Sequence, residues 1–325
     1  MAKLSRFEQL DRAVDALLMR SADAQPPADA ELAALVSMAA ELRNLPQEDF
    51  RTRLQADLER SAIMSSSATA TQAAVQKGFQ SLIPYLAVRE AEELIVFVKQ
   101  AFGAEETLRT TGSQGGLHAE VRIGDSIVMI GGGEPWKGTP MPTNLHMYVP
   151  DADAVYRRAL AAGATSTYAP MDQPYGDREG GVRDAAGNNW YIATHKLTGH
   201  YVPEGLRTLT PGLQPRGAAR LIDFLQQAFD AVESFCEKSP DGAVVHAKIQ
   251  IGKSVLEMGE AHGPFGPMPT MFYLRVDDVD AVYKRALAAG ATSISEPANQ
   301  PYGERVGAVK DPADNQWYLA SPIGA

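Results

Sequence analysis

One 16-residue segment occurs twice in the chain, and this repeat constrains the fold more than any other feature. DADAVYRRALAAGATS at 151–166 returns as DVDAVYKRALAAGATS at 278–293, with 14 of the 16 positions identical. Three further segments return in the same order at an offset of 127 or 128 residues: HAEVRIGDSIVMIG as HAKIQIGKSVLEMG, QPYGDR as QPYGER, and DAAGNNWYIA as DPADNQWYLA. Copies of this length can each enclose a core, unlike the short repeats of a solenoid. We therefore predict two tandem domains, at residues 79–198 and 205–323.

Each copy contains the same succession of expected elements twice. In the first copy LIPYLAV is typical of a strand, EAEELIVFVKQAFG has helical periodicity with Gly103 as its stop, and three short strands follow. The succession restarts at NLHMYVP, where Asp151 is the expected N-cap of a helix that Gly163 ends. Each domain is therefore predicted to hold two βαβββ units, which gives an α+β chain with four such units.

The first 78 residues differ from both copies. Residues 1–62 hold three amphipathic segments and are predicted to form a helical domain, with Asp29 as an N-cap and Pro46 in a first turn. Residues 63–78 are rich in Ser, Ala and Thr and are predicted to be a flexible linker. We expect the helical domain to serve oligomerisation or docking, as a homodimer contact or a site for a protein partner. A separate regulatory function stays open.

Composition argues against several classes of protein. The 325 residues carry a net charge of −10 and a pI of about 5.2, without a cluster of Lys and Arg, so nucleic acid is not an expected partner. No apolar run approaches the roughly 20 residues of a membrane-spanning helix, and the N-terminus lacks an apolar signal core. The single cysteine, Cys236, can form neither an internal disulfide nor a cysteine zinc site. We expect a cytoplasmic protein without a membrane partner.

The ordered series of motifs, present twice, resembles a known superfamily. PYLAV, HAEVRIGDSIVMI, LHMYV, DQPYGDR and VRDAAGNNWYIATH are together similar to the vicinal oxygen chelate superfamily, which contains glyoxalase I, bleomycin-resistance proteins and extradiol dioxygenases. Within it, the series is most similar to the PhnB-like branch. The resemblance implies that each domain's two βαβββ units form a curved sheet, with helices on the convex face and the ligand in the concavity. Members of the superfamily also pair units between chains or between tandem domains, so that pairing is open here too.

Strand alternation assigns side chains to the two faces independently of the resemblance. The polar faces of NLHMYV and HAEVRI hold Asn144, His146 and Tyr148, and His118, Glu120 and Arg122. The opposite faces are apolar and suit the underside of a helix. We expect Trp190 and Trp317 to pack in the core under the helices rather than to stack on a cofactor.

Metal-dependent members of the superfamily place four ligands, usually His, Glu or Gln, on the concave face. The matching positions here are Ile83, Met129, Asn144 and Tyr191 in the first copy, and Thr210, Glu257, Met271 and Tyr318 in the second. A divalent ion needs several N, O or S donors around it, and Glu257 is the only strong donor in these sets. We predict no metal and no other cofactor. This disfavours glyoxalase and dioxygenase activity, because both chemistries use the ion as Lewis acid or oxygen activator.

The predicted sites are therefore two cavities with aromatic walls and a few polar groups, the usual form of a small-molecule site. The first is expected to contain Tyr85, Met129, Asn144, His146, Tyr148 and Tyr191, and the second Gln214, Glu257, Tyr273, Arg275 and Tyr318. His118 and His246 are further candidates for ligand binding. In the QPYGDR and QPYGER loops, Arg178 and Arg305 either meet an anionic ligand or pair locally with an acidic residue.

Three functions stay open at this point. The first is a metal-independent protein that sequesters or senses a small, aromatic metabolite or antibiotic. The second is a lyase or isomerase in which His146 or Glu257 is the general base, with or without a metal. The third is a regulatory protein whose N-terminal helices bind a partner. Met129 is replaced by Glu257 in the second copy and His146 by Tyr273, which predicts either two different ligands or one active and one degenerate site.

Overall fold

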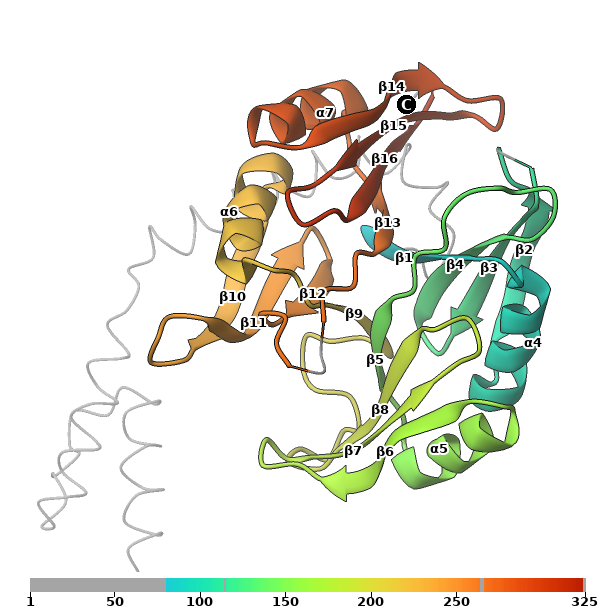
Figure 1. Cartoon of the computed structure of the whole chain (residues 1–325), viewed down its shortest axis with the longest axis vertical. Helices are drawn as coiled ribbons and strands as arrows, with labels where there is room; N and C mark the ends of the chain where they lie inside the picture. The colour runs from blue at the N-terminus through green and yellow to red at the C-terminus, as the bar shows by residue number, and fades with distance from the viewer. Residues whose placement is uncertain (1–79, 114, 264–265, 324–325) are drawn as a thin grey trace, which may run out of the picture. The chain divides into compact units, whose positions relative to one another are not determined.

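The computed structural model describes residues 80–113, 115–263 and 266–323 (Figure 1). The predicted helical domain at 1–62 and the predicted linker at 63–78 lie outside the described residues. None of the helices in the described part has the length and apolar character needed to cross a bilayer.

The described residues form four βαβββ units in succession, as the repeat predicts. The first two units consist of β1 (Leu82–Val88), α4 (Ala91–Phe102), β2 (Glu105–Thr111), β3 (Leu117–Ile123) and β4 (Ser126–Gly132), then β5 (Asn144–Tyr148), α5 (Ala152–Ala161), β6 (Thr165–Asp172), β7 (Asp177–Arg183) and β8 (Asn189–His195). The last two consist of β9 (Leu209–Leu213), α6 (Ala218–Phe229), β10 (Val232–Lys238), β11 (Val244–Ile251) and β12 (Ser254–Met258), then β13 (Met271–Arg275), α7 (Val279–Ala288), β14 (Thr292–Asn299), β15 (Glu304–Lys310) and β16 (Gln316–Pro322).

The two eight-stranded sheets each combine one unit from each repeat. Sheet A has the order β14-β15-β16-β13-β1-β4-β3-β2 and joins the first unit to the fourth; sheet B has the order β10-β11-β12-β9-β5-β8-β7-β6 and joins the second to the third. The junctions are antiparallel, with Ile83 opposite Tyr273 in sheet A and His146 opposite Thr210 in sheet B. The expectation that the two units of one domain form a sheet is therefore wrong. The alternative, in which the tandem domains pair with each other, is confirmed.

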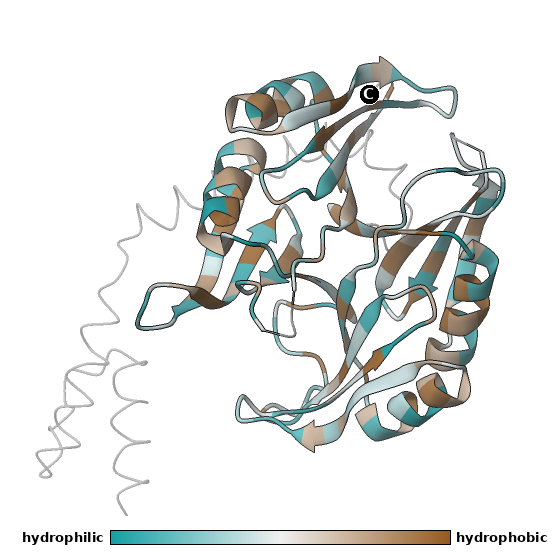
Figure 2. Ribbon diagram, viewed as in Figure 1, coloured by the Kyte–Doolittle hydropathy of each residue, from teal (hydrophilic) through white to brown (hydrophobic). Residues whose placement is uncertain are grey.

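The hydrophobic cores, in contrast, follow the repeats. One core unites apolar residues of the first and second units, including Trp190, with Leu209 of β9. The other unites those of the third and fourth units, including Trp317, with Leu82 of β1. The helices contact each other in the same pairs, α4 with α5 and α6 with α7 (Figure 1). Figure 2 shows apolar and polar residues alternating along these helices, as expected of elements with one buried side. Each copy thus supplies all but one of the buried residues of one core. The prediction that both tryptophans lie in the core is confirmed.

The helix ends have the signals that the sequence predicts. Asp151 and Asp278 are the N-caps of α5 and α7, and each accepts a hydrogen bond from the backbone N–H three residues later, at 2.9 and 3.0 Å. Gly103 follows α4 with φ of 68°, a left-handed conformation that favours glycine. These caps fix where each helix begins and ends over its sheet.

Candidate functional site

Each sheet has one face covered by helices and one that carries the side chains alternating with the core residues. We call the second the helix-free face. On β4, for example, Val128 and Ile130 belong to the core, whereas Ile127 and Met129 form a separate cluster on the helix-free face. The polar side chains that the sequence analysis singled out lie on these two faces, and the faces differ in chemistry.

The helix-free face of sheet B centres on an imidazole between two carboxylates. In His146, Nε2 lies 3.0 Å from Oε2 of Glu179 and Nδ1 lies 3.1 Å from Oε2 of Glu257. Burial alone would lower the pKa of His146, but the two carboxylates outweigh it and raise the pKa to about 10. Burial likewise opposes ionisation of Glu179 and Glu257, yet the facing imidazole holds the pKa of each below its usual range. At neutral pH the group is an imidazolium between two carboxylates.

Further polar side chains of sheet B are paired with one another. The Tyr168 hydroxyl donates to Glu179, the Tyr148 hydroxyl donates to Asp177 at 3.1 Å, and Nδ1 of His195 lies 2.6 Å from Asp177. Burial, followed by nearby carboxylates, raises the pKa of Tyr148 and Tyr168, so both hydroxyls stay protonated. This face is a network of ion pairs and hydrogen bonds among side chains of β5, β6, β7 and β8.

The same network crosses between the repeats. Asn144 donates to Oε1 of Gln214 at 3.2 Å, and on the other side Lys248 and His246 lie 3.7 and 3.6 Å from Glu257. Asn144 belongs to the second unit and Gln214 follows β9 in the third, so residues predicted for separate cavities touch.

The helix-free face of sheet A is apolar at its centre. Ile83, Ile127 and Met129 form a small hydrophobic cluster, separate from the two main cores, and the half-buried Tyr85 and Tyr273 pack against it. These five side chains come from three adjacent strands, β13, β1 and β4. The centre of this face is therefore apolar and flanked by two aromatic rings, where sheet B has charges.

Tyr85 is held in place by neighbours on β3 and β4. Its hydroxyl lies 3.1 Å from Nδ1 of His118, and its ring lies over Gly131, where an added Cβ would meet the hydroxyl at 2.0 Å. Burial raises the pKa of Tyr85 to about 12 and lowers the pKa of His118. A protonated Tyr85 hydroxyl is therefore hydrogen-bonded to a neutral imidazole, which restrains the tyrosine ring.

A group of charged residues lies beside this cluster. Nη1 of Arg275 is 3.3 Å from Oε1 of Glu304, the Tyr273 hydroxyl donates to Glu304, and the Arg275 guanidinium stands 5.9 Å from the centre of the Tyr273 ring. Glu120 on β3 is buried on the same face, and burial raises its pKa.

The structure brings the predicted site residues together in combinations other than those expected. The sheet A face holds Tyr85, His118, Met129, Tyr273, Arg275 and Tyr318, and the sheet B face holds Asn144, His146, Tyr148, Tyr191, Gln214, His246 and Glu257. Each predicted cavity is thus divided between the two sheets, because each sheet takes a unit from each repeat. His146 and Glu257, considered as bases of different sites, are in contact.

Several residues of these faces were not among the predicted site residues. Glu179 and Asp177 lie on β7, and Glu304 lies on β15. The motif series identified both segments as strands, but the sequence analysis did not assign their side chains to either face of the sheet. The alternation in DREGGVR could have placed Glu179 with Tyr191 of the neighbouring strand. No local signal could have placed it beside a residue of β12.

The arginines after the QPYG turns have a structural role. Arg178 donates through Nη2 to Asp153 in the first turn of α5 at 2.7 Å, and Arg305 donates to Asp280 of α7 in the same way, also at 2.7 Å. Both therefore tie a strand to a helix, which agrees with pairing to an acidic residue rather than contact with a ligand.

The donors at the superfamily's metal positions do not fit a metal. With the observed pairing, sheet A offers Ile83, Met129, Met271 and Tyr318 at these positions, and sheet B offers Asn144, Tyr191, Thr210 and Glu257. The first set is mainly hydrocarbon and thioether, and in the second Glu257 is engaged by His146 and Lys248. Within residues 80–323 as described, no three His, Cys, Asp or Glu side chains are arranged to hold a metal ion.

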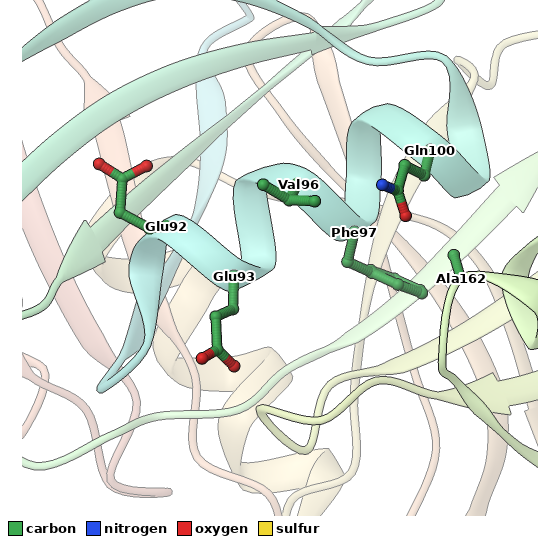
Figure 3. A pocket seen from close by; sticks show the side chains of 6 residues that line it. All are labelled: Glu92, Glu93, Val96, Phe97, Gln100 and Ala162. Atoms are coloured by element: carbon green, nitrogen blue, oxygen red, sulfur yellow. The ribbon is translucent and has the colours of Figure 1, made fainter.

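A surface pocket of about 250 Å³ lies elsewhere, on the solvent side of α4 (Figure 3). It is lined by Glu92, Glu93, Val96, Phe97, Gln100 and Ala162. None of the predicted site residues lines it, and Glu92 is already paired with Arg109.

The fold and both faces now permit comparison with known proteins. Residues 79–192 and 208–319 match the model of the Glyoxalase/Bleomycin resistance protein/Dioxygenase superfamily, and the chain belongs to this superfamily. An uncharacterized protein of Mycobacterium bovis is 37% identical over 126 residues, which cover 35% of this chain and 83% of that one. A Mycobacterium tuberculosis protein has the same identity, with 74% of its length covered.

Solved structures share the fold at low sequence identity. Glyoxalase I from Zea mays superposes with a TM-score of 0.58 and 14% identity, over 74% of this chain and 92% of that one. A putative dioxygenase from Bacillus subtilis gives a TM-score of 0.51 and 10% identity, over 74% of this chain and 84% of that one. The match to about three quarters of the chain agrees with a tandem pair of glyoxalase-type domains.

Proposed function

We propose that this protein binds a small planar organic molecule on the helix-free face of sheet A and thereby sequesters or senses it. The observation that carries the proposal is the apolar cluster of Ile83, Ile127 and Met129 with Tyr85 and Tyr273 packed against it. Apolar surface and aromatic rings with a few polar groups around them are the usual composition of a small-molecule site. Tyr85, fixed by His118 and Gly131, supplies a preorganised ring for stacking.

The chemistry of sheet B supports assigning the ligand to sheet A. His146 is ion-paired with both Glu179 and Glu257, so a ligand entering there would have to separate buried ion pairs. A pKa of about 10 also leaves His146 protonated at neutral pH, and a protonated imidazole cannot act as a general base. This argues against the lyase or isomerase alternative in which His146 takes a proton.

The proposed binding is independent of a metal, because the donor sets of both faces are unsuited to one. We propose a small metabolite or an antibiotic with an aromatic ring as the ligand. Membership of the PhnB-like branch stays a prediction. The alternative of a regulatory protein depends on the helices predicted at residues 1–62, and this segment lies outside the described residues.

A thermal-shift screen of small aromatic compounds, in buffer with EDTA, tests the proposal. We expect at least one compound to bind with micromolar affinity, which corresponds to about −8.2 kcal/mol. Isothermal titration should then show that Tyr85→Ala weakens this compound at least tenfold, because the variant removes the stacking ring.

The matched control is Tyr191→Ala, which removes a half-buried tyrosine from sheet B. It should leave the affinity within twofold. Binding that requires a divalent ion, or that Tyr191→Ala abolishes while Tyr85→Ala leaves it unchanged, would contradict the proposal.

A further inference from the structure

Glu120 is a buried carboxylate with an unused oxygen on the helix-free face of sheet A. The residue is 6% exposed, and its Oε2 has no hydrogen-bond partner in the described part of the chain. In the sheet register it faces Leu108 on one side and Met129 on the other, and neither side chain is a hydrogen-bond donor. A buried carboxylate oxygen without a donor is destabilising, so a native chain retains one where something else supplies the donor.

Arg275 offsets the negative charge of Glu120 only in part. Its charge acts on Glu120, but its guanidinium is ion-paired with Glu304 at 3.3 Å. Glu304 in turn accepts from Tyr273 and adds a second negative charge to the surroundings. Consistent with this, burial raises the pKa of Glu120 and Arg275 only partly opposes the effect.

The position in sheet B that is equivalent to Glu120 carries a cation, Lys248. Lys248 follows His246 by two residues, as Glu120 follows His118, and it stands opposite Glu257 in the register. Lys248 and Glu257 are 3.7 Å apart, which makes this cross-strand pair an ion pair. In sheet A the corresponding pair is Glu120 opposite Met129, so the carboxylate is present and the cation is absent from its pair.

We propose that Glu120 binds a protonated nitrogen of the ligand, whose aromatic ring lies against Tyr85 and the apolar cluster. The ligand thus belongs to the class of planar aromatic amines and amidines, and it supplies the cation that Lys248 supplies in sheet B. Aromatic carboxylates are disfavoured, because they would bring a further negative charge beside Glu120 and Glu304. This inference rests on the proposed function, since it names the chemistry of the molecule that sheet A binds.

The test uses three probes that share one ring system: 4-aminoquinoline, quinoline and quinoline-4-carboxylate, titrated into the full-length protein at neutral pH and low salt. The amine should bind at least tenfold more tightly than quinoline, and the carboxylate more weakly than either. Glu120→Gln keeps the size of the side chain and should reduce the affinity for the amine to that for quinoline. Lys248→Gln, the matched variant in sheet B, should leave all three affinities within twofold.

A second variant keeps the test decisive if Glu120→Gln is unstable. Met129→Lys places a cation opposite Glu120, as in the pair of sheet B, and should abolish the preference for the amine while circular dichroism shows an unchanged fold. Equal binding of amine and quinoline to the wild type, or an amine affinity that neither variant changes, would overturn the inference and leave the proposed function standing. If none of the probes binds, and the wider aromatic screen is also negative, both fail.

Discussion

The ionisation of His146 is linked to the stability of the fold. Its pKa rises from about 6.5 in an unfolded chain to about 10 when folded. A pKa raised by folding stabilises the native state fully below the unfolded value, and this contribution is lost as the pH rises through the folded value. Glu179 and Glu257, whose pKa values are lowered, act in the opposite sense and lose their contribution as the pH falls below about 4.3.

We therefore predict that the free energy of unfolding decreases between pH 7 and pH 10 and that His146→Gln removes most of this decrease. At pH 7 the variant should be less stable by about 3–5 kcal/mol, because it removes the cation that lies between two buried carboxylates and leaves Lys248, near Glu257, as the remaining cation of the group. Urea unfolding at several pH values measures both effects. Parallel pH profiles for the two proteins would show that His146 is not protonated in the fold.

At this scale the sequence predicts which side chains share a face but not which of them touch. Alternation in NLHMYV correctly separates His146 from Leu145 and Met147. The contact between His146 and Glu257 spans 111 residues and depends on which units pair, which neither strand encodes. The unused oxygen of Glu120 is likewise visible only once its neighbours on β2 and β4 are known.

At the scale of elements, the matched helices α5 and α7 begin at aspartates in extended conformations. Asp151 and Asp278 each satisfy a backbone N–H of the first turn that has no partner within the helix. The starts of these two helices were predictable from the sequence for this reason, since the capping interaction is local.

We predict that Asp151→Ala and Asp278→Ala each lower the free energy of unfolding by about 1 kcal/mol. The two effects should be similar because the caps have the same geometry. Asp→Asn variants at the same positions retain a side-chain acceptor and serve as controls. Chemical denaturation measures the change, and an alanine variant as stable as its asparagine counterpart would contradict the capping role.

The pairing of strands between units was not predictable in the same way. β1 and β5 both have a neighbour from the opposite repeat, β13 and β9, through backbone hydrogen bonds that most side chains allow. The repeated motifs are equally compatible with pairing within a repeat, so only the three-dimensional structure distinguishes the two arrangements.

At the scale of the whole molecule, each repeat contains two strands whose neighbours in the sheet belong to the other repeat. In an isolated fragment of residues 79–198, β1 would lose β13 and β5 would lose β9, which leaves both edges unpaired. We predict that this fragment forms a dimer in which the first unit of one copy pairs with the second unit of the other.

Sedimentation equilibrium should therefore give twice the mass of the fragment, and a two-fold symmetric contact is expected because each copy offers the same two edges. A stable monomer with a cooperative unfolding transition would mean that the two units of one repeat can close a sheet alone.

Joining the two copies in one polypeptide has a consequence for how the sites can change. In a symmetric pair of identical subunits, every mutation appears in both sheets at once, so neither can specialise alone. Within a fused chain the symmetry is only approximate, and a substitution at Met129 leaves its counterpart Glu257 untouched. Sheet B can thereby acquire buried ion pairs while sheet A retains Glu120, the carboxylate that we propose binds the ligand.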